Sequence, residues 1–399
     1  MVDYTQHTIY LQDGVLFNFK RHLKKKKQTL FLLLDAVKDG RNKSGKRHPL
    51  PLILLILFCG IIAGNTTVKD CWLWALHNRK WLEKYADMPH GLADQRTIAR
   101  AIAKTGVDSL IITFLTFRRR VYGFLPSGSA SFDGKTLNGA HGKNVIKHIL
   151  SLFTHENHQT LGQIGVTQKE NEIPAFHRLL DQLPSVAGML LLGDALHTQR
   201  DTIEDILAHH ADYLLFAKGN QEQLSKDLAT FFADVPFGVI TDTVTLSENK
   251  RKRNTTTTVT VSHNQQMCDY LGTNNWQKVK TIGKIHRVGV RIASDGKETP
   301  VDETVYCISS RILTAGEIAG HSRKHWKIEN NLHWEKDWLF LEDRQPLRSG
   351  NAPQVMSFLR SAALSLFALF TFTSPTEVVS NFSKNQTLHH RFIRVAGLV

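Results

Sequence analysis

The sequence has few cysteines, and none of them is arranged to bind zinc. Its 399 residues include four cysteines, Cys59, Cys71, Cys268 and Cys307. None of these forms a CxxC pair, so the pattern excludes a zinc ribbon and offers no disulfide framework. A reducing compartment fits this usage, and we expect a cytoplasmic protein.

Long apolar runs are also absent. The longest uncharged apolar stretch, residues 50–64, contains Pro51. It is shorter than the roughly 18–20 residues that a membrane-spanning helix needs. Residues 362–372 form a still shorter apolar run, so both stretches predict core helices and we expect no membrane partner. The polar N-terminus does not resemble a signal peptide.

Acidic residues are outnumbered by basic ones. The chain has 50 Lys and Arg against 36 Asp and Glu, a formal net charge of +14. Its 42% hydrophobic and 22% charged residues are otherwise usual for a globular protein. The basic excess favours a polyanionic partner, most simply nucleic acid.

Composition divides the chain into five predicted parts. A basic arm, whose basic run at 20–27 is either solvated or in contact with DNA, precedes an all-α unit. An α/β core follows in two pieces, separated by a Val- and Thr-rich β insertion that carries basic residues at 250–253. The predicted bounds are 1–28 for the arm, 29–125 for the helical unit, 126–238 for the first core piece, 239–310 for the insertion and 311–399 for the second core piece.

Secondary structure within the first core piece alternates between strand and helix patterns. We predict three strands, a helix, a strand, a second helix and a last strand. This order is typical of a mixed α/β sheet flanked by helices. The predicted ranges are 130–133, 146–153 and 160–166 for the first strands, then 171–183, 188–192, 202–210 and 213–217; the all-α unit has predicted helices at 30–37, 50–64, 68–85 and 96–120.

Two aspartates follow predicted strands. Asp133 stands in S-F-D-G-K-T and Asp194 in L-L-L-G-D-A-L-H-T-Q. Carboxylates at the C-terminal ends of neighbouring parallel strands project into one crevice. Crowded carboxylates need a cation, and hard oxygen ligands suit Mg²⁺ or Mn²⁺. Taken singly, Asp133 before Gly134 is also typical of a turn, and Asp194 of a helix N-cap.

A third carboxylate, Glu329, stands in H-W-K-I-E-N-N-L-H-W-E-K-D-W at 325–338. Helical spacing puts His325, Glu329 and His333 on one face, with Lys336 a turn beyond. Such a face can hold a metal, bind a phosphate, or simply form a buried helix with a satisfied ion pair. Two tryptophans, at positions 326 and 334, are predicted to pack this helix against the sheet, with stacking on an unpaired base as the alternative.

Several sequence blocks in this order resemble DDE-type transposases of bacterial insertion sequences. The chain is most similar to the H-repeat-associated group, relatives of the insertion-sequence-four superfamily. The resemblance covers nearly the whole chain. It rests on D-G-R-N-K-S-G-K-R-H-P-L before the first long apolar run, F-D-G-K-T, Q-K-E-N-E-I at 168–173, D-A-L-H-T-Q, Y-L-L-F-A-K-G-N-Q at 213–221, and the segment around Glu329.

The resemblance implies an RNase H-like catalytic core with a β insertion before the glutamate helix. It implies that Asp133, Asp194 and Glu329 form a catalytic triad that binds two Mg²⁺ or Mn²⁺ ions. The implied reaction is hydrolysis of transposon-end phosphodiesters, followed by joining of the freed 3′ ends to target DNA. Its implied partner is double-stranded DNA, bound by a homodimer at the bacterial nucleoid.

The implied DNA contacts are polar residues beside the triad. Where the wider superfamily has an arginine four residues before the glutamate, this chain has His325, with Arg323 close by. Lys218 to Gln221 is alternatively a plain strand-to-helix turn. The predicted DNA-binding residues are Lys135, Lys218, Asn220, Gln221, Arg323, Asn330 and Lys336.

Three further residues carry weaker predictions. Lys169 and Glu172 are DNA contacts or a surface helix cap, and His197 is a surface histidine or a neighbour of the carboxylates.

Two other functions remain open. One is a nuclease or resolvase on the same fold, and the other is a transposon-derived DNA-binding protein without catalysis. The three carboxylates count against the second, and the basic arm and the β insertion count against a minimal nuclease. Inverted repeats flanking the gene would distinguish a transposase from both.

Overall fold

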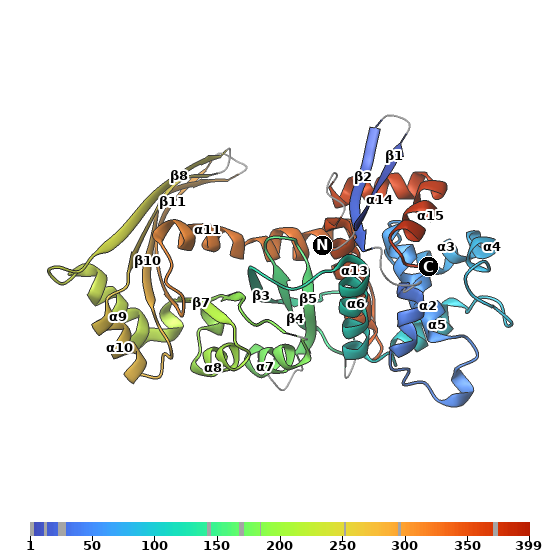
Figure 1. The fold of residues 1–399 in the computed structure, drawn as a ribbon, viewed down its shortest axis with the longest axis horizontal. Helices are drawn as coiled ribbons and strands as arrows, with labels where there is room; N and C mark the ends of the chain where they lie inside the picture. Colours follow the sequence, from blue (N-terminus) through green and yellow to red (C-terminus); the bar gives the residue numbers. More distant parts are fainter. Residues whose placement is uncertain are drawn as a thin grey trace. The chain divides into compact units, whose positions relative to one another are not determined.

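The computed structural model forms two compact units (Figure 1). The first unit comprises Met1–Pro126, Gly134–Pro184 and Glu329–Val399, and the second comprises Ser127–Asp133 and Ser185–Ile328. The structure describes residues 4–11, 14–22, 29–141, 145–166, 171–183, 185–250, 253–293, 297–369 and 374–399.

The first unit starts with an antiparallel hairpin of strands β1 (Tyr4–Leu11) and β2 (Gly14–His22). The sequence had predicted a basic arm here, solvated or in contact with DNA, and no strands. The missed signal is the alternation in Y-T-Q-H-T-I-Y-L and V-L-F-N-F-K, which is typical of strands. Of the predicted basic run, residues 23–27 lie outside the described residues.

Helices follow the hairpin, as predicted. Helix α2 (Leu50–Ile62) is buried over nearly its whole length and packs against α3, α5 and α13, which confirms it as a core helix. The predicted helix at 96–120 is broken before α6, where the backbone turns at Gly106. The helices here are α1 (Leu30–Leu33), α2, α3 (Val68–His77), α4 (Arg79–Leu82), α5 (Gln95–Ile102) and α6 (Val107–Tyr122).

Three strands of the first unit lie in the order β5-β4-β3. Strands β4 (His148–Thr154) and β5 (Thr160–Val166) pair in antiparallel fashion, and α7 (Glu172–Gln182) packs against both. Helix α13 packs against β5, α2 and α6, so it joins the strands to the N-terminal helices. The other C-terminal helices are α12 (Trp334–Phe340), α13 (Ala352–Ala368), α14 (Pro375–Lys384) and α15 (Gln386–Val395).

The second unit is built on a mixed sheet in the order β3-β6-β7-β11-β10-β9-β8. The first residues of β3 (Ser129–Thr136) run parallel to β6, and β6 runs parallel to β7, whereas the remaining pairs are antiparallel. The mixed α/β sheet that the sequence predicted is thereby confirmed. The other strands are β6 (Leu190–Gly193), β7 (Asp212–Ala217), β8 (Thr241–Lys250), β9 (Arg253–Ser262), β10 (Thr281–Ile292) and β11 (Glu298–Ser309).

Helices cover both faces of this sheet. Figure 1 shows α11 (Ala315–His325) along one face, with α8 (Arg200–Ala208), α9 (Glu222–Ala233) and α10 (Gln265–Thr273) on the other side. Buried side chains of α11 and alternate strand residues form the core between them. Helix α10 interrupts the predicted β insertion, and the Asn264 side chain caps it by accepting a hydrogen bond from the Met267 amide.

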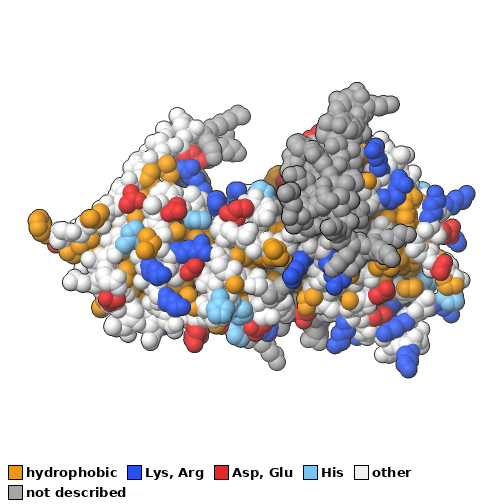
Figure 2. All heavy atoms as spheres, viewed as in Figure 1, with side chains coloured by type: hydrophobic (Ala, Val, Ile, Leu, Met, Phe, Trp, Pro, Cys, Tyr) orange, Lys and Arg blue, Asp and Glu red, His pale blue; other side chains and the backbone are white. Residues whose placement is uncertain are grey.

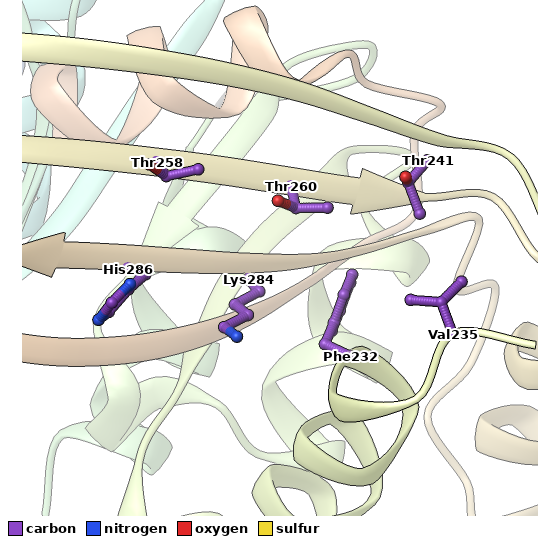
Figure 3. Close-up of a pocket in the computed structure, with 7 residues that line it drawn as sticks. All are labelled: Phe232, Val235, Thr241, Thr258, Thr260, Lys284 and His286. Atoms are coloured by element: carbon purple, nitrogen blue, oxygen red, sulfur yellow. The ribbon is translucent and has the colours of Figure 1, made fainter.

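The β8–β10 surface carries a shallow cavity of about 210 Å³ (Figure 3). None of the residues that line this cavity was predicted as a site residue. The lining consists of Phe232, Val235, Thr241, Thr258, Thr260, Lys284 and His286.

Basic side chains do not gather in one patch on the face drawn in Figure 2; they are interspersed with acidic and neutral ones. Among the described residues, no helix is long and apolar enough to cross a membrane. Of the basic residues at 250–253, Arg251 and Lys252 lie outside the described residues, between the paired ends of β8 and β9.

Candidate active site

The sequence had predicted that Asp133 stands at the end of its strand. Asp133 instead lies within β3, so this prediction is wrong. The parallel pairing of β3 with β6 covers only Ser129 to Ser131, and the strand then continues to Thr136. Asp133 therefore stands just beyond the residues that pair with β6, and its side chain is half-buried.

Asp194 follows β6 directly and caps the next turn. Its Oδ1 accepts hydrogen bonds from the amides of Leu196 (3.0 Å) and His197 (3.3 Å) in the 3₁₀ turn η3 (Ala195–His197). The N-cap prediction is therefore confirmed, and it fixes the carboxylate at the end of β6. The preceding residue, Gly193, has no room for a Cβ because the Phe132 ring lies against it.

His325 is influenced by both aspartates within the second unit. Its Nδ1 forms a 2.9 Å hydrogen bond with Ser131 Oγ, and its ring lies 5.8 Å from that of Phe216. Burial lowers the pKa of His325, while the charges of Asp133 and Asp194 act to raise it; burial prevails. Both carboxylates therefore act on one imidazole, which is neutral at neutral pH.

His197 is part of the same cluster, so its prediction as a surface histidine is wrong. The side chain is buried, its ring lies edge-on to Phe132 at 4.8 Å, and its charge acts on the pKa of His325. The sequence did not reveal the burial of His197, because this residue follows a turn expected to be exposed, where no apolar periodicity marks a core position.

The Lys218–Gln221 turn packs against the loop that carries Asp194. Asn220 donates its side-chain amide to the carbonyl of Ala195, and Gln221 donates to Gln199 Oε1 at 3.0 Å. Lys218 is exposed and pairs with Glu303 at 3.2 Å. The turn is therefore a strand-to-helix turn, and its amides support the Asp194 loop.

Glu329 lies in the first unit, in a π-helical turn (Glu329–His333) before α12. Its exposed carboxylate has an oxygen within 4.8 Å of a ring nitrogen of the buried His333. A π turn has more residues per turn than an α-helix, so the four-residue spacing predicted for this face is not regular here. Turns of this kind are frequent at functional sites.

Two lysines predicted to bind DNA are held inside the first unit. Lys336 is 1% exposed and contacts Glu342 (3.1 Å) and Ser357 Oγ (2.9 Å). Lys135 forms ion pairs with Asp337 and, at 3.6 Å, with Asp343. Each ammonium group thus already has buried or half-buried acidic partners, and a DNA contact of either lysine stays a prediction.

The tryptophans of this segment are exposed, so the prediction that they pack the helix against the sheet is wrong. Trp326 is 59% exposed and Trp334 is 51% exposed. Trp334 instead stacks on Trp338, with ring centroids 5.8 Å apart and planes at 8°. An aromatic residue near a charged motif was judged from hydrophobicity alone, which does not reveal the face that a helix turns to solvent.

The remaining predicted residues divide between exposed positions and undescribed ones. Arg323 and Asn330 are exposed. Lys169 lies outside the described residues. The first turn of α7 contains Glu172, but its cap is Asn171, whose Oδ1 accepts from the amide of Ile173 at 3.1 Å. Glu172 pairs with His148, a residue that no sequence pattern had indicated.

Comparisons with known proteins identify the family. A family model described as "Transposase DDE domain" matches residues 116–366, well over half of the chain. The chain belongs to the DDE transposases. A second model, described as DDE_Tnp_1-associated, matches residues 32–118 of this transposase. The mixed sheet fits the RNase H-like core that the resemblance implied.

Relatives place the transposase in the H-repeat-associated group, as predicted. It is 30% identical to "Putative transposase YncI" of Escherichia coli O157:H7 over 85% of this chain and 87% of the relative. It is 28% identical to "H repeat-associated putative transposase YhhI" of Escherichia coli strain K12 over 84% of this chain and 88% of the relative.

The donor atoms of the site suit a hard divalent cation. Asp133 and Asp194 offer carboxylate oxygens beside one neutral imidazole, and such oxygens are the ligands that Mg²⁺ and Mn²⁺ prefer. In the second unit, these two carboxylates stand in half-buried positions, Asp133 within β3 and Asp194 directly after β6.

Proposed function

We propose that this DDE transposase cleaves phosphodiester bonds at transposon ends and joins the freed 3′ ends to target DNA. Asp133, Asp194 and Glu329 are the proposed ligands of two Mg²⁺ or Mn²⁺ ions. The observation that supports this most is that the charges of Asp133 and Asp194 both act on the His325 ring, because two carboxylates beside one side chain favour a bound cation.

The protein's own groups have separate roles in this proposal. The Asp194 loop is fixed by its cap and by Asn220, so one carboxylate is presented with little freedom. Glu329 is the proposed third ligand, because its carboxylate is exposed on a π turn and the resemblance assigns it this role. Bound divalent ions would supply an activated water and stabilise the leaving 3′ oxygen.

Exposed polar and basic side chains are the proposed contacts to the DNA backbone. His325 does not replace the arginine of the wider superfamily as a charge, because its pKa is lowered and its Nδ1 bonds to Ser131. Arg323, on the same helix and exposed, is the proposed phosphate contact, together with Lys218 and Asn330. The proposed assembly is a homodimer on double-stranded DNA. The five parts predicted from the sequence are the proposed domains of each chain.

Cleavage of DNA that carries the element's own flanking ends tests the proposal. Asp133→Asn, Asp194→Asn and Glu329→Gln should each abolish Mg²⁺-dependent cleavage and leave DNA affinity, measured by fluorescence anisotropy, largely unchanged. Asp201→Asn, which removes an exposed carboxylate of α8, is the matched control and should cleave normally. Appreciable cleavage by the Glu329→Gln protein would contradict the triad.

The same assay separates the alternative functions. Cleavage without joined 3′ ends would favour a nuclease or resolvase. Binding of the ends without any cleavage by the unaltered protein would favour a DNA-binding protein that has lost catalysis.

A further inference from the structure

A histidine–glutamate pair lies over the part of β3 that follows Asp133. His148 Nε2 and Glu172 Oε1 are 2.6 Å apart, and His148 Nδ1 forms a 3.0 Å hydrogen bond with Thr136 Oγ1. The pair therefore connects β4 and α7 to β3. The two side chains are 29% and 15% exposed, so the pair is screened from water only in part.

Gly134, the residue after Asp133, makes room for this pair. A Cβ built at Gly134 would overlap both Glu172 Oε1 and His148 Nε2. The pair therefore rests directly on the backbone at this position, which suits only glycine. Because of this close approach, the pair restrains the backbone at Gly134, the residue next to Asp133.

The pair contacts β3 beyond the end of its parallel pairing with β6, on the side where β4 is the neighbouring strand. The parallel pairing with β6 ends at Ser131, so it does not fix the strand at Asp133. Within the first unit, the three residues after Asp133 are each held by charged or polar side chains. Gly134 lies under the pair, Lys135 binds Asp337 and Asp343, and Thr136 bonds to His148.

We propose that His148 and Glu172 form a positioning dyad, which fixes the backbone at Gly134 and thereby the direction of the Asp133 carboxylate. The inference rests on the proposed function, in which Asp133 is a metal ligand. Outer groups that orient a metal ligand typically change metal affinity by about 10–100-fold when they are removed. A partly exposed ion pair, in contrast, contributes little to the stability of the fold.

Direct Mn²⁺ binding to the full-length protein, measured by electron paramagnetic resonance, tests the dyad without relying on activity. Glu172→Gln removes the charge and keeps the size of the side chain. We expect it to weaken Mn²⁺ binding about tenfold, with an unchanged melting temperature and unchanged DNA affinity. The matched control is Asp181→Asn, which removes the carboxylate of another histidine pair on the same helix, His177–Asp181, at 3.4 Å and 55% exposure. This control should bind Mn²⁺ normally.

A second pair of variants tests the close approach at Gly134. Gly134→Ala should also weaken Mn²⁺ binding, because the added methyl group displaces the dyad. Glu172→Ala removes the overlap with Glu172 and leaves the His148 ring without the partner that holds its Nε2 over Gly134. Gly134→Ala combined with Glu172→Ala should therefore be little worse than Glu172→Ala alone.

The outcomes separate a positioning role from a structural one. Normal Mn²⁺ binding by a folded Glu172→Gln protein would overturn the dyad. A lowered melting temperature with unchanged Mn²⁺ affinity would make the pair merely structural and would overturn it too. Failure of the unaltered protein to bind Mn²⁺ would count against the proposed function itself.

Discussion

Glu342 is a carboxylate that the fold keeps almost entirely from water, at 3% exposure. It bonds to Lys336 at 3.1 Å and to Arg360 at 3.4 Å, and Arg360 also donates to the carbonyl of Thr66 at 3.0 Å. Burial opposes ionisation of Glu342, but the charges of Lys336, Arg360 and Lys135 outweigh it and lower its pKa to about 2. The cluster ties α12 and α13 to the N-terminal helices.

Glu342→Gln should destabilise the protein markedly, because it leaves two buried cations without their counter-charge. Breaking a buried ion pair by removing one partner costs about 3–5 kcal/mol. Urea unfolding measures the loss, and Glu298→Gln, at an exposed strand end, is the control that should change little. Equal unfolding midpoints for the variant and the unaltered protein would contradict a stabilising cluster.

The stabilisation has a defined pH dependence. The folded-state pKa of Glu342 is about 2, below its ordinary value of 4.5. A lowered carboxylate pKa contributes stability that is complete above the ordinary pKa and is lost as the pH falls toward the folded pKa. The stability difference between the unaltered protein and Glu342→Gln should therefore shrink between about pH 4.5 and pH 2. A difference that stays constant over this range would contradict the assignment.

Some residues of the candidate site and of the Glu342 cluster could be predicted from the sequence, and others could not. Asp133 and Asp194 could be predicted as site residues because each follows an apolar strand pattern, and such a pattern indicates the local backbone structure. The burial of Lys336 and of His197 could not be predicted, because it depends on partners distant in sequence, such as Glu342 and Phe132. Local patterns contain no signal for such partners.

At the scale of elements, the π turn at Glu329–His333 separates the carboxylate from the buried part of α12. A π turn accommodates one residue more than an α-helical turn. Deleting Asn331 should therefore restore α-helical spacing and keep Lys336 in its cluster, while the Glu329 side chain points elsewhere.

We expect the Asn331 deletion to retain most of its thermal stability and to lose DNA cleavage. Circular dichroism melting and the cleavage assay measure the two effects. Asn331→Ala, which keeps the chain length, is the control and should cleave. A deletion variant that cleaves at the normal rate would show that the turn does not aim Glu329.

Elements were predicted best where apolar spacing is regular. The strands β4, β5 and β7 and the helix α2 lie close to their predicted positions, because their own residues bury a continuous face. The π turn and α10 were not predicted, because they depend on local hydrogen bonding that apolar patterns do not reveal. The N-terminal hairpin was missed for a different reason, since its alternation was passed over beside the basic run.

At the scale of the whole molecule, the net charge of +14 should dominate DNA affinity. Each phosphate contact releases bound counterions, so affinity falls steeply with salt. If about six phosphates are contacted, binding should weaken by roughly 10³-fold between 50 and 200 mM salt. Fluorescence anisotropy titrations over this range measure the slope, and Arg323→Ala should reduce it by about one. A slope near zero would contradict an electrostatic DNA interface.

The two compact units are built from separated stretches of chain, which has a consequence for synthesis on the ribosome. Helices α2 and α6 leave the ribosome early, but α13, against which both pack, is among the last segments to emerge. The part of the α2 surface that packs against α13 therefore stays uncovered until late in translation. Nascent chains of this protein should bind chaperones for longer than a protein whose domains are continuous in sequence, and premature termination before α13 should leave an aggregating product.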